Sequence, residues 1–241
     1  MIAQICEESK CTGCLACMNL CPCGAITCQE REDGNVIPQI DPEKCIECHR
    51  CVQGCPENHV KEKHEPRQCY AAWQKDRKER KYSASGGIAF GFYKRWIQNA
   101  GIVYGAAFNE KGILTQQKAE TLEEARKFRG SKYVQSYNGF SYSEIGKELK
   151  KGKKVLFIGT PCQIAGLKAY LGKASDALVT IDLICHGTPP MSYLEEYIKE
   201  IAGAEKVDRV SFRGEKDYHM VFYSQDRVVY SQRFRKDLYY T

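Results

Sequence analysis

The sequence contains no stretch close to the ~20 consecutive apolar residues that a membrane-spanning helix needs, and its mean hydropathy is −0.50. It also lacks a basic start followed by an apolar run, the pattern of a secretory signal. A Gly-x-Gly-x-x-Gly motif is absent, which disfavours a Rossmann dinucleotide site. We therefore expect a cytoplasmic protein with no membrane span.

Cysteine, in contrast, is abundant: 14 of the 241 residues are cysteine. The chain is much longer than the small secreted scaffolds that disulfides stabilise. In the cytoplasm thiols stay reduced, so a high cysteine content indicates metal binding or catalysis rather than cross-linking.

Charge divides the chain into two parts. Residues 1–62 carry a net charge of −5, and the rest carries +11. Between them, residues 63–81 are dense in both signs and predict a charged linker. Acidic residues interrupt the basic ones there and no recognition motif accompanies them, which argues against a nucleic-acid site. The basic part is better suited to an acidic partner, an anionic cofactor or the acidic N-terminal part.

Residues 1–62 contain an internal repeat of the pattern Cys-x2-Cys-x2-Cys-x3-Cys-Pro. It occurs at Cys11, Cys14, Cys17 and Cys21, and again 34 residues later at Cys45, Cys48, Cys51 and Cys55. In this motif the first three thiolates bind one [4Fe–4S] cluster and the fourth binds the other. The predicted ligands are Cys11, Cys14, Cys17 and Cys55 for cluster 1, and Cys45, Cys48, Cys51 and Cys21 for cluster 2.

Zinc is the competing metal, but zinc sites use two Cys-x2-Cys pairs rather than a triplet with a distant fourth cysteine. The segment resembles the bacterial two-cluster ferredoxins, which implies an α+β ferredoxin-like domain over residues 1–62. A short strand is expected at residues 36–41. The four cysteines left over in and after this segment are expected to be small buried side chains; they are Cys6, Cys23, Cys28 and Cys69.

Residues 82–241 alternate between helical and extended patterns. Apolar runs predict strands at 102–108, 155–158 and 178–184, and a hairpin is expected around 219–234. Helices are predicted at 88–97, 143–149, 162–171 and 190–202. Strands that are apolar on both faces and separated by helices indicate an α/β domain with a mainly parallel sheet.

Two cysteines follow two of these strands, each beside a Gly-Thr-Pro turn. Cys162 comes after the strand at 155–158, and Cys185 and His186 come after the strand at 178–184. Ligands bind at the carboxyl edge of such sheets, so the two cysteines could approach each other there. Three roles remain open for Cys162: a nucleophile with His186 as base, a ligand of a further metal centre, or a packed thiol.

Two further segments offer polar groups for an anion. Ser83, Ser85, Gly86 and Gly87 precede the helix at 88–97 and could bind an anion at its N-terminus, although an ordinary serine cap explains them equally well. Arg129 and Lys132 could face a phosphate or a reduced flavin, or lie in a solvated loop.

Taken together, these motifs and their order resemble the coenzyme F420 hydrogenase/dehydrogenase beta-subunit family. The resemblance implies an iron–sulfur flavoprotein in which FAD exchanges a hydride with a deazaflavin or another conjugated substrate. It implies that the serine–glycine segment and Lys132 contact the flavin, and that Cys162 and Cys185 bind a third cluster. Members of that family commonly extend further, so we expect a fragment or a reduced form, with a third cluster short of ligands.

The resulting hypothesis is an oxidoreductase with a ferredoxin-type domain at 1–62 and a flavin-binding domain at 82–241. Flavin suits the conversion because it takes one or two electrons, whereas each cluster carries one. The alternative is a non-enzymatic electron-transfer subunit that docks to a partner enzyme. A redox partner protein or ferredoxin is expected in either case.

Overall fold

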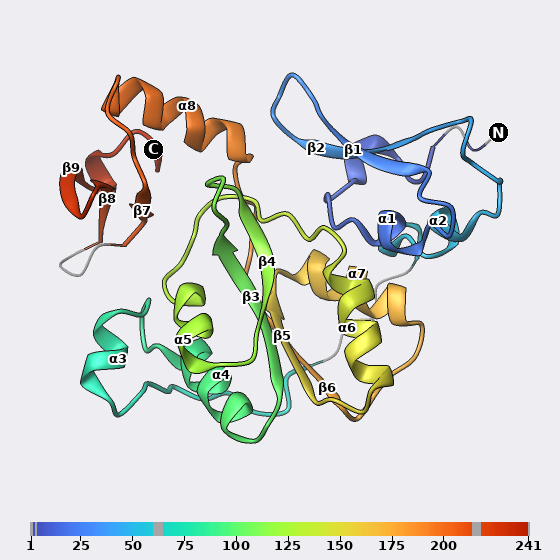
Figure 1. The fold of residues 1–241 in the computed structure, drawn as a ribbon, viewed down its shortest axis with the longest axis horizontal. Coiled ribbons are helices and arrows are strands. Elements are labelled where there is room, and N and C mark those ends of the chain that lie inside the picture. Colours follow the sequence, from blue (N-terminus) through green and yellow to red (C-terminus); the bar gives the residue numbers. More distant parts are fainter. Residues whose placement is uncertain (1, 3, 60–64, 214–217, 241) are drawn as a thin grey trace.

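The computed structural model describes residues 2, 4–59, 65–213 and 218–240. Its N-terminal domain is built from short elements, α1 (Ala16–Leu20), β1 (Ile26–Glu30), β2 (Val36–Ile40) and α2 (Arg50–Gln53), with 3-10 turns at Glu8–Lys10 and Pro56–Asn58. The strands β1 and β2 form an antiparallel hairpin (Figure 1). The predicted strand at 36–41 is therefore present.

The sequence repeat is also a repeat of backbone conformation. Gly13 and Leu15 have φ of 64° and 62°, and the residues 34 positions later, Glu47 and His49, have φ of 55° and 57°. Non-glycine residues rarely adopt this left-handed conformation, and it persists where the surrounding structure requires it. Leu15 and His49 each precede a helix, α1 and α2 respectively. Both motifs therefore wind their cysteines through the same turn.

The second domain contains a four-stranded sheet in the order β4-β3-β5-β6. Its strands are β3 (Ile102–Phe108), β4 (Leu114–Ala119), β5 (Val155–Gly159) and β6 (Leu178–Asp182). The β3–β5 and β5–β6 pairs are parallel, but β3 and β4 form an antiparallel hairpin. The prediction of a mainly parallel sheet is corrected to a mixed one. The reason is that β4 is largely polar and follows a tight turn, so no apolar run marked it as a strand.

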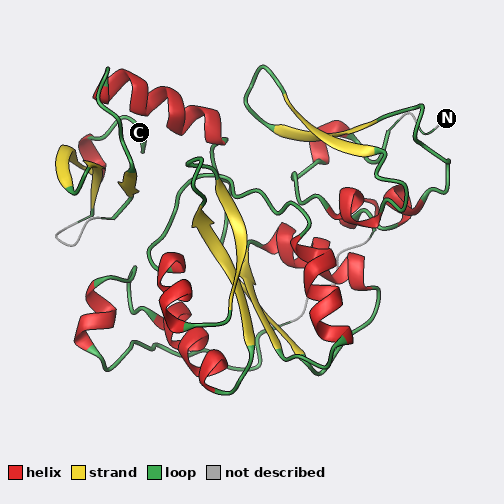
Figure 2. Ribbon diagram, viewed as in Figure 1, coloured by secondary structure: helices red, strands yellow, loops and turns green. Residues whose placement is uncertain are grey.

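Helices cover both faces of this sheet (Figure 2). On one face α6 (Ser141–Lys150) and α7 (Pro161–Leu171) pack on β3 and β5, and on the other face α4 (Ile88–Gln98) and α5 (Leu122–Ala125) do so. The apolar stripe predicted for 88–97 supplies Phe90 and Tyr93 to this second core. A 3-10 turn at Arg126–Phe128 completes the same layer.

Strand β6 departs from its predicted environment. The sequence predicts burial on both faces, yet β6 lies at the edge of the sheet and its residues are half-buried or exposed. Val179 is 39% exposed, and Leu183 and Ile184, which follow the strand, are more exposed still. An apolar run cannot distinguish a central strand from an edge strand, because both carry the same residues.

The C-terminal part forms a separate layer. Helix α8 (Met191–Ala202) packs on a three-stranded antiparallel sheet of β7 (Arg209–Ser211), β8 (His219–Ser224) and β9 (Arg227–Arg233), and a 3-10 turn follows at Phe234–Lys236. The predicted hairpin is the β8–β9 pair. Aromatic side chains dominate its core, where Tyr197 and Tyr230 donate hydrogen bonds to the fully buried Asp237 carboxylate at 3.0 and 3.1 Å.

The predicted linker is partly helical. Its predicted boundary with the first domain, between residues 62 and 63, lies outside the described residues, but α3 (Arg77–Lys81) falls within it. The Asp76 carboxylate caps this short helix by accepting from the amides of Lys78 and Glu79. Among the described helices, none is long and apolar enough to cross a membrane.

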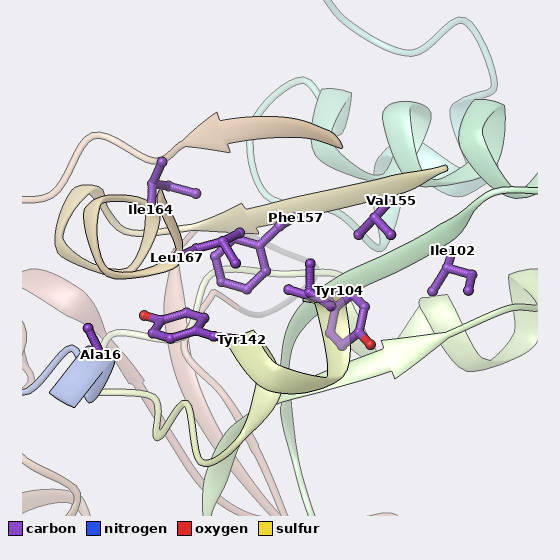
Figure 3. Close-up of a cluster of buried hydrophobic side chains, with 9 residues drawn as sticks. Ala16, Ile102, Tyr104, Tyr142, Val155, Phe157, Ile164 and Leu167 are labelled. Atoms are coloured by element: carbon purple, nitrogen blue, oxygen red, sulfur yellow. The ribbon is translucent and has the colours of Figure 1, made fainter. Parts of the chain in front are cut away.

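The two domains share a hydrophobic core. Ala16 of α1 is buried in the same cluster as Tyr142 of α6, Leu167 of α7 and Phe157 of β5, as Figure 3 shows. Helix α1 contacts both α6 and α7. The first cysteine motif is therefore packed directly on the helical layer of the second domain.

Candidate cluster sites and electron path

The eight motif cysteines lie around two cavities in the N-terminal domain. We call them the proximal cavity, which lies on the side of the second domain, and the distal cavity. The proximal cavity has about 340 Å³ of empty space and the distal one about 290 Å³, part of each open to solvent. The proximal cavity is lined by Cys11, Cys14, Cys17 and Cys55, together with Cys6. The distal cavity is lined by Cys21, Cys45, Cys48 and Cys51, together with Cys23.

The fourth cysteine of each motif thus lies at the other motif's cavity. Cys21 follows α1 but lines the distal cavity, and Cys55 follows α2 but lines the proximal one. Electrostatic interactions between thiols agree with this division, because Cys17 interacts with Cys14, Cys11 and Cys55. Cys51 likewise interacts with Cys21 and Cys48.

Burial controls the acidity of these thiols. It raises the pKa of Cys14 to about 11, with a further contribution from the nearby Cys162 thiol, and it raises that of Cys17 as well. Buried thiols of this kind stay protonated unless a cation stabilises the thiolate. Bound iron would supply that cation, and its binding to these thiols would release protons.

Both thiol sets fit a [4Fe–4S] cluster. The four irons of such a cluster lie apart and each takes one thiolate, so the ligands surround a cavity. A zinc ion instead draws four sulfurs to within about 2.3 Å of one centre. Throughout the described ranges, no three His, Cys, Asp or Glu side chains are grouped tightly enough to hold one metal ion. The apolar side chains at the distal cavity, such as Ile26 and Ile40, would limit contact with water.

Hydrogen bonds from α6 and the loop before it hold the first motif in place. The Tyr142 hydroxyl donates to the Cys14 carbonyl oxygen at 2.9 Å, and the Asn138 amide donates to the same oxygen at 3.1 Å. Asn138 also donates to the Tyr142 hydroxyl at 2.7 Å. From the other side, Asn19 of α1 donates to the Gly139 carbonyl at 2.8 Å and accepts from the Ser143 amide at 3.1 Å. Of the side chains that make these contacts, Tyr142, Asn138 and Asn19 carry no motif that marks them in the sequence.

Cys162 and Cys185 follow neighbouring parallel strands, since Gly159 of β5 is paired with Asp182 of β6. The Cys162 sulfur lies 3.1 Å from the Thr160 hydroxyl, at the N-terminus of α7. In the described part of the chain no hydrogen bond joins Cys162 to His186, which is exposed. The third cluster and the Cys162–His186 pair stay predictions.

A buried polar network that the sequence did not reveal lies beside Cys162. Gln163 is 4% exposed, and its side-chain amide donates to the Ser136 hydroxyl at 2.8 Å. Its side-chain oxygen accepts from the Gln116 amide at 3.1 Å and from the Thr160 backbone at 3.0 Å. This network fixes the carboxyl end of β5, where ligands bind in open α/β sheets.

The predicted flavin contacts already have partners inside the chain. Ser83 donates to the Glu79 carbonyl at 2.8 Å, and Arg129 pairs with the Glu79 carboxylate at 2.8 Å while stacking over Phe90. Ser85 has a long contact of 3.4 Å with Arg213. Gly87 has a positive φ of 70° and precedes the first residue of α4, and a Cβ on Gly86 would collide with the Ala72 carbonyl. These side chains are engaged within the chain, and their contacts with a flavin stay predictions.

Lys132 is the most perturbed cation among the candidates. Its amine donates to the carbonyl oxygens of Lys127 and Arg129 at 3.0 and 3.1 Å. Burial lowers the pKa of Lys132 to about 7, because the ammonium ion is poorly solvated there. A neutral amine at this position would therefore be present near physiological pH.

This shift predicts a pH-dependent contribution to stability. Between pH 7 and about 10.5 the unfolded chain binds the Lys132 proton more tightly than the folded chain, so the unfolding free energy should rise with pH in that window. Below pH 7 both states are protonated and the cost of burying the charge is complete. In urea unfolding at pH 7, 8.5 and 10, the unfolding free energy of wild type should rise with pH relative to that of Lys132→Met. The exposed Lys127→Met is the control, and parallel curves for wild type and Lys132→Met would contradict the expectation.

Comparison with known proteins finds one family match in each half of the chain. Residues 10–59 match the model of a 4Fe-4S dicluster domain, and residues 152–237 match that of the C terminus of the coenzyme F420 hydrogenase/dehydrogenase beta subunit. The chain therefore contains a match to a dicluster domain and a match to the C-terminal part of this beta-subunit family. The resemblance seen in the sequence is thereby confirmed. All eight motif cysteines lie within the dicluster match, and Cys162 and Cys185 lie within the beta-subunit match.

Curated relatives of the chain include components of redox complexes. One of the subunits of F(420)H(2) dehydrogenase from Methanosarcina mazei is 25% identical over 200 residues, covering 76% of the chain and 55% of that protein. One of the subunits of the Na(+)-translocating ferredoxin:NAD(+) oxidoreductase complex from Acetobacterium woodii is 44% identical over 48 residues, 20% of the chain and 13% of that protein. The chain thus spans about half the length of the Methanosarcina relative.

Among solved structures, a chain of the F420-reducing [NiFe] hydrogenase complex from Methanosarcina barkeri is similar, with a TM-score of 0.48 and 18% identity. The match covers 68% of the present chain and 59% of that chain. The flavin candidates Ser83, Ser85, Arg129 and Lys132 all precede the beta-subunit match.

Proposed function

We propose that this protein is an electron-transfer oxidoreductase in which the dicluster domain passes single electrons to or from the beta-subunit domain. The observation that carries this proposal is the division of the eight cysteines between two cavities, with one cysteine of each motif crossing to the other. A two-cluster ferredoxin motif requires that arrangement. The proposed ligands are the predicted ones, cluster 1 in the proximal cavity and cluster 2 in the distal cavity.

The packing of the domains supports an order of transfer. The proximal cavity includes Cys14, whose carbonyl is fixed by Tyr142 and whose thiol interacts with Cys162. The distal cavity is lined by the exposed Cys48 and by Ile46, which is 64% exposed. A partner could therefore exchange electrons with the distal site, while the proximal site faces the carboxyl edge of β5. The acidic first domain favours a redox partner with a basic docking surface.

The finer proposal concerns the group in the second domain that exchanges electrons with the clusters. It is supported by the order of the motifs and by the similarity to a subunit of F(420)H(2) dehydrogenase from Methanosarcina mazei. When bound, a flavin would supply the conversion of single electrons to a hydride for an organic acceptor. In this chain Gln163 and Thr160 would shape the site at the carboxyl end of β5. Lys132 would offer an amine whose pKa is about 7.

The competing proposal is an electron-transfer protein without its own catalytic site, which docks to a partner enzyme. It is favoured by the internal contacts of Ser83, Arg129 and Lys132, which leave these polar groups engaged. Both proposals share the two clusters and differ in the flavin.

Anaerobic reconstitution with iron, sulfide and FAD tests both. We expect about eight irons per chain. A bound flavin spectrum, followed by stopped-flow reduction by a deazaflavin, nicotinamide or flavin donor, would support hydride exchange. The same iron content without flavin would support the docking protein. A chain that binds fewer than four irons would contradict the cluster proposal itself.

A further inference from the structure

The distal cavity holds five thiols where a cluster needs four. Cys23 lines it beside Cys21, Cys45, Cys48 and Cys51, and the sulfurs of Cys23 and Cys21 are 3.7 Å apart. The expectation that Cys23 is a small buried side chain is wrong, because Cys23 is exposed. Its position at the cavity is therefore not explained by packing.

The repeat itself brings this side chain to the cavity. Cys23 stands two residues after Cys21, and its counterpart 34 residues later is Glu57, two residues after Cys55. Glu57 lines the proximal cavity just as Cys23 lines the distal one. The backbone of both motifs thus directs this position toward a cavity, and in the first motif the residue there carries a thiol, a group that can bind iron.

Cys28 provides a contrast within the same domain. It lies in β1, and its sulfur contacts the Met18 sulfur at 4.0 Å and the Tyr137 hydroxyl at 3.7 Å. It lines neither of the two cavities. Cys28 has the packing role that the sequence suggested, whereas Cys23 does not.

We propose that Cys23 is a reserve ligand of the distal cluster and replaces Cys21 when Cys21 is lost or released. In the exchange the iron–sulfur bond to Cys21 breaks and one to Cys23 forms. The Cys23 thiol gives its proton to solvent and the released Cys21 thiolate takes one up, so charge and cluster oxidation state do not change. Two of the five thiols at this cavity, Cys23 and Cys48, are exposed, so solvent can reach this side of the site. The inference rests on the proposed clusters.

The test is the iron and acid-labile sulfide content of four variants after anaerobic reconstitution. Cys23→Ala and Cys21→Ala should each keep about eight irons, and Cys21→Ala/Cys23→Ala should fall to about four. The matched control, Cys21→Ala/Cys28→Ala, should keep about eight. Alanine is used because a serine oxygen could itself bind iron. A loss of about four irons in Cys21→Ala alone, or retention of eight in Cys21→Ala/Cys23→Ala, would overturn the proposal.

Alkylation supplies a second measurement that does not depend on reconstitution yield. In the wild-type holoprotein, iodoacetamide should modify Cys23, whereas in Cys21→Ala the same thiol should be protected, as read by peptide mass spectrometry. Modification of Cys23 to the same extent in both proteins would refute the exchange. Wild-type protein without iron would instead refute the proposed clusters, so the two failures are distinguishable.

Discussion

Removal of the clusters should unfold the N-terminal domain while the sheet of the second domain stays folded. The helices α1 and α2 have five and four residues, far below the ~12 that an isolated helix needs. An isolated two-stranded hairpin such as β1–β2 is marginal in water. Much of the remaining core consists of cysteines around the two cavities, so binding of iron supplies a large part of the folding free energy.

Hydrogen exchange measured by mass spectrometry, before and after chelation, checks this expectation. Amides of α1, β1 and α2 should lose protection, and those of β3 and β5 should keep it, because two separate hydrophobic clusters cover the faces of their sheet. The second domain is the internal control. Unchanged protection of α1 in the chelated protein would contradict the prediction. Loss throughout β3 and β5 would show instead that the domains unfold as one unit.

Tyr142→Ala should have the largest effect of any single substitution at the domain interface. The side chain is fully buried, and its ring packs edge-on against that of Phe157, with the ring centroids 6.3 Å apart. Its hydroxyl donates a hydrogen bond to the Cys14 carbonyl. Truncation of a buried aromatic ring costs about 3–5 kcal/mol of stability. Tyr142→Phe retains the ring, and the Cys14 carbonyl still accepts from Asn138, so its cost should be about 1 kcal/mol.

These variants also test the electron path. Both should keep the iron content of wild type, since neither removes a thiol, but Tyr142→Ala should slow oxidation of the reduced clusters by an acceptor at the second domain. Urea unfolding and stopped-flow absorbance give the two readouts. A Tyr142→Ala protein that loses under about 1 kcal/mol, or transfers electrons at the wild-type rate, would show that this contact does not couple the domains.

The sequence predicted those features that depend on local spacing. The cysteine repeat, the strand Ile102–Phe108 and the helices at α4, α7 and α8 follow from patterns within a few residues, and each is present. Strand β4 was missed because its sequence, Leu-Thr-Gln-Gln-Lys-Ala, has no apolar run, although Leu114, Gln116 and Ala119 are buried. Without that strand, the mixed character of the sheet could not be inferred.

Interactions between the two domains could not be predicted from the sequence, for a different reason. Cys14 and Tyr142 are 128 residues apart, and neither carries a local signal that it will meet the other. Tyr142 was one tyrosine among 15. Cys23 could be found from the sequence only in part. The repeat makes it equivalent to Glu57, but only the structure shows that its sulfur lies 3.7 Å from that of Cys21 at the distal cavity.

The exchange of the fourth cysteine between motifs has a consequence for how such a domain can arise. A chain with a single motif would have three thiols at its own cavity and a fourth directed at a neighbour's. It could complete its clusters only as a pair of copies, each lending one ligand to the other. When both motifs lie in one chain, each cluster obtains its fourth ligand whatever the protein concentration. A mutation that removes one motif would then cost both clusters a ligand.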